Sequence, residues 1–316
     1  MSSTNELPFE RTVTREELVF WMILAHLPRW KDLITNRLVV DILVNKGILL
    51  SEFFGLSPEK RAEIFNLTGS QEKDIQSELE KVEWYKSILS ELERAGIQLV
   101  TLNSPFFPKT LKQKLKMTSC PLIIYCKGNL DLLNRPTSAI VGSRKANVEA
   151  LEFTDLTAKR LTTEGYVVVS GFAKGVDQQA LNSALEAKGA SIIVLPQGIL
   201  TFKSGFRKYT NQISEGSVLV CSFFPPKAPW SAGLAMGRNA YIYGLAQDIF
   251  VAQTESTGGT WAGAVNGLKK NHKIFIYYSP TMDSQPLREL IKLGAIPIQN
   301  TGIFAKGETT IQRIPI

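Results

Sequence analysis

Cysteine and histidine are scarce in this chain, which has three Cys and two His among its 316 residues. Cys120, Cys126 and Cys221 are odd in number, and their spacing is not that of zinc ligands. Structural disulfides are typical of oxidising compartments. The cysteines therefore predict unpaired thiols in a reducing compartment, and they argue against a zinc site.

A long apolar run is also missing. A transmembrane helix needs a run of about 18 or more apolar residues, and no uncharged stretch of that length occurs. The N-terminus is polar and mixed in charge, unlike a signal peptide. We therefore expect a cytoplasmic protein without a membrane partner.

Acidic residues are under-represented in the second part of the chain. Residues 1–100 contain 12 Lys and Arg against 16 Asp and Glu, a net charge of −4. Residues 101–316 contain 24 against 13, a net charge of +11. A basic region of this size favours a polyanionic partner for the second part of the chain.

The stretch from Ser138 to Asp177 has the pattern of a β-turn-α-β unit. The apolar run Ala139–Val141 ends in the turn Gly142-Ser143-Arg144, and leucines at helical spacing follow it. A second β-branched run, residues 166–169, leads into a second small-residue loop, residues 170–177. Such loops precede helix N-termini that favour phosphate. The full dinucleotide fingerprint, with three spaced glycines and an acid after the next strand, is absent.

The remaining pattern predicts two domains. Residues 1–100 read as helical from Glu16 to about Gly96, like a small sterile-alpha-motif or helix-hairpin-helix bundle. Residues 101–316 alternate apolar strands with helices, and their polar or glycine-rich turns mostly follow the strands. This alternation predicts an α/β domain with a doubly wound, mostly parallel, Rossmann-like sheet.

In such a sheet, ligands bind beyond the carboxyl ends of the strands, at the point where the strand order reverses. Asp177 is the internal counter-charge for the cations there, and we expect it to orient an Arg or Lys rather than to act as a base. The segment Gly237–Ala240 is expected to open a helix over Tyr241–Ala246. Arg238 can therefore also be read as a helix N-terminal residue paired with a carboxylate. The side chains expected to converge at this edge are Arg144, Lys174, Arg238, Asn239 and Thr260.

At these residues the chain resembles the DNA-processing protein A (DprA or Smf) family. The resemblance spans roughly residues 18–298, and each motif is weak alone while the ordered set is specific. The matching segments are Ala139–Arg144, Ser170–Asp177, Gly237–Asn239, Gly259–Trp261 with Ala264, the aromatic-proline turn Phe107-Pro108, and the region 287–295.

The resemblance implies a binding protein for single-stranded DNA, not an enzyme, with no catalytic residue, metal or cofactor. It further implies a role in natural transformation and recombination, in which the protein loads a RecA-type recombinase, and a homodimer formed through the Rossmann-like domain. Carried over by position, the DNA contacts fall on Ser143, Arg144, Ser170, Gly171, Phe172, Lys174, Arg238 and Asn239. The small-residue loops themselves predict two further phosphate contacts, through the backbone of Gly142 and Gly175, and they place Thr260 on the far side of the site. The ring of Phe172 could offer a face to a base.

The sequence departs from the family pattern at several positions, as a divergent member does. Leu181 stands where the family commonly has His, Ala240 where it has a second Arg, and Phe223 where it has Glu. We also expect no C-terminal winged-helix module, which many members carry.

Two other functions fit parts of the sequence. A nucleotide sensor or a phosphoribohydrolase-like enzyme would use the same Rossmann-like cleft, but the Thr257–Trp261 turn lacks the glutamate of that enzyme signature. A structural adaptor would act through the helical domain, whose Trp21, Trp30 and Trp84 suit either a partner surface or a small core.

Overall fold

A computed structural model of the chain describes residues 13–299. It divides into two compact units, Met1–Cys126 and Lys127–Ile316. The domain boundary near residue 100 stays a prediction, as does the missing winged-helix module, which concerns residues outside those described. Within residues 13–299, no helix is long and apolar enough to cross a membrane.

The first unit is mainly helical, as the sequence pattern predicted for residues 16–96. A π-helical turn, Asp41–Asn45, extends the second helix, and one antiparallel strand pair, with Gln98 opposite Cys126, completes the unit. The helices and strands are α1 Arg15–Ala25, α2 Asp32–Val40, α3 Leu50–Gly55, α4 Pro58–Phe65, α5 Gly69–Leu79, α6 Val82–Arg94, β1 Gln98–Thr101, α7 Lys109–Ser119 and β2 Ile123–Lys127.

Two buried charged side chains join the helices of this unit. The Glu17 carboxylate accepts hydrogen bonds from the amides of Leu50 and Ser51 at 3.1 and 2.7 Å, so it caps the N-terminus of α3. Arg61 is 1% exposed and donates to the Glu72 carboxylate and to the carbonyl oxygens of Phe54 and Leu56. These bonds tie α1, α3, α4 and α5 together through groups that burial would otherwise penalise.

The second unit alternates strands and helices. Short 3-10 turns, Leu130–Asn134 and Ile199–Thr201, precede β3 and α10 respectively. The other elements are β3 Thr137–Val141, α8 Val148–Thr163, β4 Val167–Ser170, α9 Val176–Glu186, β5 Ser191–Val194, α10 Lys203–Lys208, α11 Thr210–Ser214, β6 Val218–Ser222, α12 Ala232–Leu245, β7 Asp248–Val251, α13 Gly259–Lys269, β8 Lys273–Tyr277, α14 Gln285–Lys292 and β9 Ile296–Ile298.

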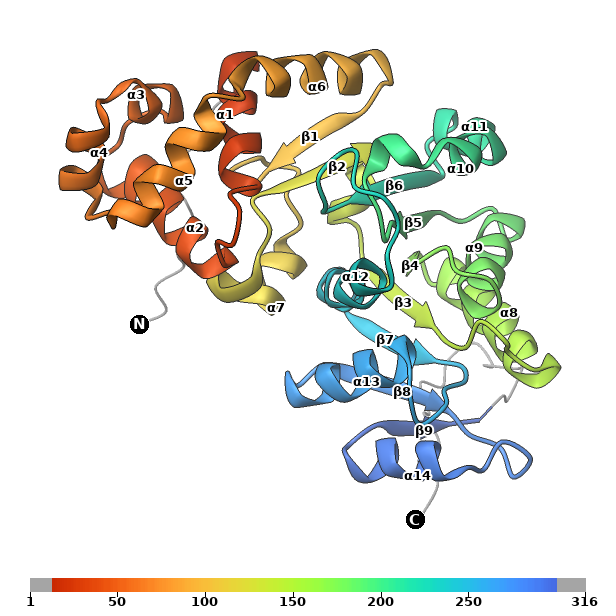
Figure 1. Ribbon diagram of the computed structural model, residues 1–316. Helices are drawn as coiled ribbons and strands as arrows, with labels where there is room; N and C mark the ends of the chain where they lie inside the picture. Colours follow the sequence, from red (N-terminus) through yellow and green to blue (C-terminus); the bar gives the residue numbers. More distant parts are fainter. Residues whose placement is uncertain (1–12, 300–316) are drawn as a thin grey trace. The chain divides into compact units, whose positions relative to one another are not determined.

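Seven strands of this unit form a parallel sheet in the order β6-β5-β4-β3-β7-β8-β9. The central strands are buried over their whole length, as expected for a sheet covered on both faces. Figure 1 shows α8 and α9 on one face and α12 and α13 on the other. The predicted fold class, a doubly wound α/β sheet preceded by a helical region, is confirmed.

The strand order reverses at β3. The chain moves outward from β3 to β4 and β5 through α8 and α9, and it then returns through α12 to place β7 on the other side of β3. The carboxyl ends of β3 and β7 therefore flank the switch point of the sheet, where helices of opposite faces diverge and leave a crevice.

One predicted element has a different start. The sequence pattern placed Gly237–Ala240 at the opening of a helix that began at Tyr241, but α12 begins at Ala232. Its N-cap is Ser231, whose Oγ accepts a hydrogen bond from the amide of Leu234 at 3.1 Å. The expected start after Gly237–Ala240 is therefore wrong, because the serine cap fixes the start of the helix at Ala232. Arg238 and Asn239 consequently lie inside a helix.

Candidate functional site

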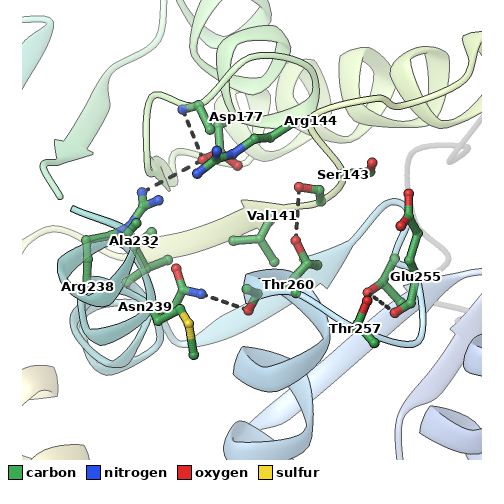
Figure 2. A pocket seen from close by; sticks show the side chains of 18 of the residues that line it. Val141, Ser143, Arg144, Asp177, Ala232, Arg238, Asn239, Glu255, Thr257 and Thr260 are labelled. Carbon is green, nitrogen blue, oxygen red and sulfur yellow. Dashed lines mark hydrogen bonds and ion pairs between the residues drawn. The ribbon is translucent and has the colours of Figure 1, made fainter. Parts of the chain in front are cut away.

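A pocket of about 440 Å³ lies at the switch point of the sheet. The loop after β3, residues 141–145, forms one wall, and the loop after β7 with the start of α13, residues 254–260, forms another. Ala173 and Asp177 close it on the β4 side, and one face of α12 completes it. Figure 2 shows these elements around the cavity. The pocket therefore occupies the position at which folds of this class bind ligands.

The loops after β3 and β4 are packed directly on each other. Gly175 has a φ of +78°, and a Cβ there would lie 2.5 Å from the carbonyl oxygen of Ser143. The amide of Val176 donates to this same oxygen at 3.4 Å, and the amide of Ser143 donates to the carbonyl of Gln253 at 3.0 Å. The amides of Ser143 and Val176 thus have internal acceptors, so anion binding here depends more on side chains than the sequence suggested.

Arg238 and Asp177 form a buried pair at the base of the pocket. The guanidinium Nη1 lies 3.8 Å from Asp177 Oδ2, and both residues are 5% exposed. Burial raises the pKa of Asp177, against the opposing effect of Arg238 and of the amide of Ala173, which donates to the carboxylate at 3.2 Å. The predicted role of Asp177 as the counter-charge of an arginine agrees with this geometry. Arg238 is consequently part of the interior and is not an exposed cation.

The second loop is shaped around this arginine. A Cβ at Gly171 would lie 1.1 Å from Arg238 Nη1, so any other residue would force the guanidinium out of its observed position. Ser170, which precedes it, is buried and donates from Oγ to the carbonyl of Ile140 at 2.7 Å. Ser170 and Gly171 therefore support the pocket from below and do not line it.

Exposed cations lie on the same loops. Arg144 and Lys145 line the pocket, and both are exposed. Figure 2 shows Arg144 extending toward Asp177 and Arg238. Burial lowers the pKa of Arg238 and the carboxylate of Asp177 opposes this, while the charge of Arg144 adds to the lowering. Lys174 is also exposed, on the adjoining loop. Glu255 lines the opposite rim and opposes part of this positive charge.

Phe172 lies away from the pocket in an aromatic cluster. Its backbone has a φ of +63°, and its ring meets Phe202 and Tyr209 edge to face, with centroids 5.0 and 5.7 Å away. The ring is partly buried. Its predicted contact with a base therefore stays a prediction, for a surface next to the pocket.

The N-terminus of α13 faces the pocket from the β7 side. Gly258 is its N-cap, with a φ of +92°, and no side chain caps the helix. Thr260 Oγ1 donates to the carbonyl of Gly142 at 3.0 Å, and Asn239 Nδ2 donates to the carbonyl of Gly259 at 2.9 Å. These two bonds tie α13 to the β3 loop and to α12, and they direct the positive end of the α13 dipole into the cavity.

The structure brings together part of the predicted residue set. Lys174 and Gly175 adjoin the pocket on the β4 loop, and Ser170, Gly171 and Phe172 lie behind it. The predicted residues that line the cavity itself are Gly142, Ser143, Arg144, Arg238, Asn239 and Thr260.

Beyond Arg238 and Asn239, sequence reasoning missed the residues of α12 that line the pocket, and it missed Trp230, which precedes the N-cap of this helix. Trp230 and Met236 line the pocket and are exposed, and the phenol of Tyr243 lines it from the interior. The signal was present as a helical repeat, since the lining residues Ala232, Ala235, Met236, Asn239, Ile242 and Tyr243 are spaced by three or four. The assumed start of the helix at Tyr241 hid this repeat.

Comparison with known proteins agrees with this arrangement. A family model for DNA recombination-mediator protein A matches residues 98–306, about two thirds of the chain. The chain belongs to this family. It is 31% identical over 215 residues to Protein Smf of Escherichia coli (strain K12), covering 67% of this chain and 56% of that protein. It is 28% identical over 178 residues to the DNA processing protein DprA of Streptococcus pneumoniae (strain ATCC BAA-255 / R6), covering 55% and 62% respectively. The chain thus spans less than two thirds of the length of either relative.

Two solved structures of the family share the fold. The DprA of Streptococcus pneumoniae superposes with a TM-score of 0.69 at 22% identity, over 91% of this chain and 95% of that one. A DprA of Helicobacter pylori, whose structure concerns its single-stranded DNA binding mode, superposes with a TM-score of 0.54 at 26% identity. That match covers 63% of this chain and 90% of the Helicobacter chain. The family match and these superpositions confirm the resemblance to the DprA family.

Proposed function

We propose that this protein binds single-stranded DNA through the pocket at the sheet switch point and the exposed cations around it, and that it acts in DNA processing and recombination. Family membership supports the proposal, because its relatives are DNA processing proteins and one of them binds single strands. The proposal assigns no catalytic reaction and no cofactor.

The observation that carries the proposal is the placement of Arg144 and Lys174. Both are exposed, and their loops are locked together by the hydrogen bond from the Val176 amide to the Ser143 carbonyl. Two cations on adjoining, packed loops can contact successive phosphates of a strand, and little conformational entropy is lost when the strand binds. Arg238 contributes by holding Asp177, which would otherwise repel a phosphate.

Salt dependence tests the proposal. With about three or four phosphates neutralised, affinity for oligo-dT should fall with salt at a log–log slope of about −2 to −3. The double variant R144A/K174A should bind at least about tenfold more weakly at low salt, with a slope shallower by about 1 to 2. Fluorescence anisotropy of labelled oligo-dT at several salt concentrations measures both quantities, and a duplex of equal length reports strand preference.

The matched control is K269A/K270A. These lysines are exposed at the other end of α13, so this variant removes the same charge away from the site. It should bind nearly as the native chain does. Binding that ignores salt, or equal losses in the two double variants, would contradict a localised phosphate site.

Two finer proposals follow from the family. We propose a homodimer through the Rossmann-like domain, and a RecA-type recombinase as the partner that receives the bound strand. Sedimentation velocity should give about twice the mass of 35.1 kDa, and the protein should speed assembly of recombinase filaments on coated single strands. A monomer at micromolar concentration, or unchanged assembly kinetics, would argue against the respective proposal.

A further inference from the structure

We infer that the pocket seats one nucleobase against Trp230 and Met236 while the phosphate of the same nucleotide unit lies toward Arg144. The inference rests on the proposed function and adds to it the part of the nucleotide that the α12 wall recognises. A nucleotide unit of this kind can belong to a strand or be a free mononucleotide.

The exposure of the two side chains is the first argument. Trp230 is 52% exposed and Met236 is 58% exposed, although both are large and apolar. Besides these two, the only exposed large apolar residues in the described part of the second unit are Val148 and Leu293. Both Trp230 and Met236 line the same pocket as Arg144. A pocket that has an apolar wall, Trp230 and Met236, and a cationic wall, Arg144, suits a ligand with a flat aromatic part and an anionic part.

The loop that carries Trp230 is anchored on both sides of this exposed residue. The ring of Phe223 stacks on Tyr241 with centroids 4.0 Å apart, which fixes the start of the Trp230 loop to α12. The amide of Gly198 donates to the carbonyl of Ala228 at 2.8 Å, and the amide of Leu200 donates to that of Pro226 at 3.0 Å. Ser231, the next residue, caps α12. A stacking surface on an anchored loop needs little ordering when a base arrives.

Unsatisfied polar atoms are the second argument. Arg238 Nε and the hydroxyl of Tyr243 are buried, and neither has a hydrogen-bond partner in the described part of the chain. Arg238 and Tyr243 are 5% and 3% exposed, and both line the pocket. A buried donor without a partner is costly in a native protein and calls for a polar group from outside. The polar edge of a base or a sugar hydroxyl supplies such a group.

The base is favoured over an aliphatic ligand by this combination. Stacking on an aromatic face tolerates any base, whereas the cations require a phosphate nearby. The pocket volume of about 440 Å³ is within the usual range for small-molecule sites. One nucleotide unit therefore uses the apolar wall, the cationic wall and the two unsatisfied groups at once.

The test compares W230A with W230F on the full-length protein. W230A should weaken binding of oligo-dT by about 5- to 150-fold, the factor that corresponds to one base–aromatic stack. W230F should stay within about threefold of the native chain, because a phenyl ring preserves a stacking face. The salt slope should not change in either variant, because neither removes a charge. The control is W84A, since Trp84 is 50% exposed but lies on α6 of the other unit.

A strand of abasic sites provides the second arm. The native chain should bind it more weakly than oligo-dT, and W230A should cause no further loss, because there is no base to stack. Equal affinities of W230A and the native chain for oligo-dT, or equal losses on both strands, would overturn the inference and leave the proposed function standing.

Free dTMP distinguishes the source of the nucleotide. If a strand supplies the base, W230A should weaken the binding of oligo-dT, and millimolar dTMP should compete poorly. If a free nucleotide is the ligand, dTMP should bind directly in calorimetry and W230A should abolish the signal. If dTMP binds in this way and oligo-dT does not bind at all, the proposed function is contradicted, while the contact of a base with Trp230 is supported.

Discussion

Replacement of Arg238 by Gln should lower the free energy of unfolding of the protein by about 3–5 kcal/mol. This is the usual effect of removing one partner of a buried ion pair, because the remaining charge keeps its desolvation penalty and loses its compensation. The charge left behind is Asp177, which lies 3.8 Å from Arg238 Nη1 and is 5% exposed. Urea denaturation followed by circular dichroism measures the change, with tryptophan fluorescence as a second probe for the two units.

The double variant R238Q/D177N separates the pair from the packing of the arginine. If the loss comes from an uncompensated carboxylate, removal of that charge should restore at least half of the lost stability. A lower pH should also restore part of the lost stability of the single variant R238Q. Burial raises the pKa of Asp177, so protonation of this carboxyl neutralises it at a higher pH than for an exposed aspartate, and the deficit of R238Q should shrink as the pH falls. A deficit that is independent of pH and additive in the double variant would assign the effect to lost packing.

Acidification should destabilise the helical unit through His26. Burial lowers the pKa of this ring to about 4, against the opposing effect of the Glu78 carboxylate. The ordinary pKa is about 6.5, so between these values the unfolded chain binds a proton that the folded chain does not bind. Stability is then complete above pH 6.5 and is lost as the pH falls toward 4. The His26 side chain keeps some exposure to solvent, which reduces the effect below that of the full pKa shift. We therefore expect the free energy of unfolding to fall by about 2 kcal/mol between pH 7 and pH 4.5.

The variant H26Q isolates this effect. His26 Nε2 lies 2.8 Å from the hydroxyl of Tyr125, and glutamine can keep a hydrogen bond to that hydroxyl without a titrating group. The difference in unfolding free energy between the native chain and H26Q should therefore change by about 2 kcal/mol over this pH range. Carboxylates that titrate in both proteins cancel in the comparison. Parallel pH profiles would show that His26 is already protonated in the folded protein or is solvated enough to titrate normally.

The order of elements in the α/β unit followed from its hydrophobic pattern. Short β-branched runs such as residues 166–169 and 191–195 became β4 and β5, because buried parallel strands need continuous apolar sequence. The switch point also followed, since it depends on the order of elements and on the usual handedness of their crossovers. Six of the predicted site residues line the pocket for this reason.

The role of Asp177 as a counter-charge followed from the sequence, but the burial or exposure of the other side chains at the site did not. The sequence grouped Arg238 with Arg144 and Lys174 as cations and left a pairing with a carboxylate open as the alternative. The structure buries Arg238 beside Asp177, in agreement with that alternative. Burial of a charged side chain is decided by the start and the face of its helix, and the pattern set the start of α12 too late. The exposed position of Trp230 was hidden for a different reason, because a Pro-rich apolar loop gives no periodic signal that separates a core residue from a surface residue.

The absence of a side chain at Gly171 restricts how this edge of the domain can vary in evolution. Since even a methyl group there would overlap the guanidinium of Arg238, a larger residue at position 171 requires Arg238 to shift or to be replaced. A side chain at Gly175 would likewise overlap the backbone of residues 143 and 144. Accepted mutations should therefore accumulate on the outer rim of the pocket, at positions such as 230 and 236. Homologous proteins can then differ in ligand preference while the packed loops beneath the pocket stay the same.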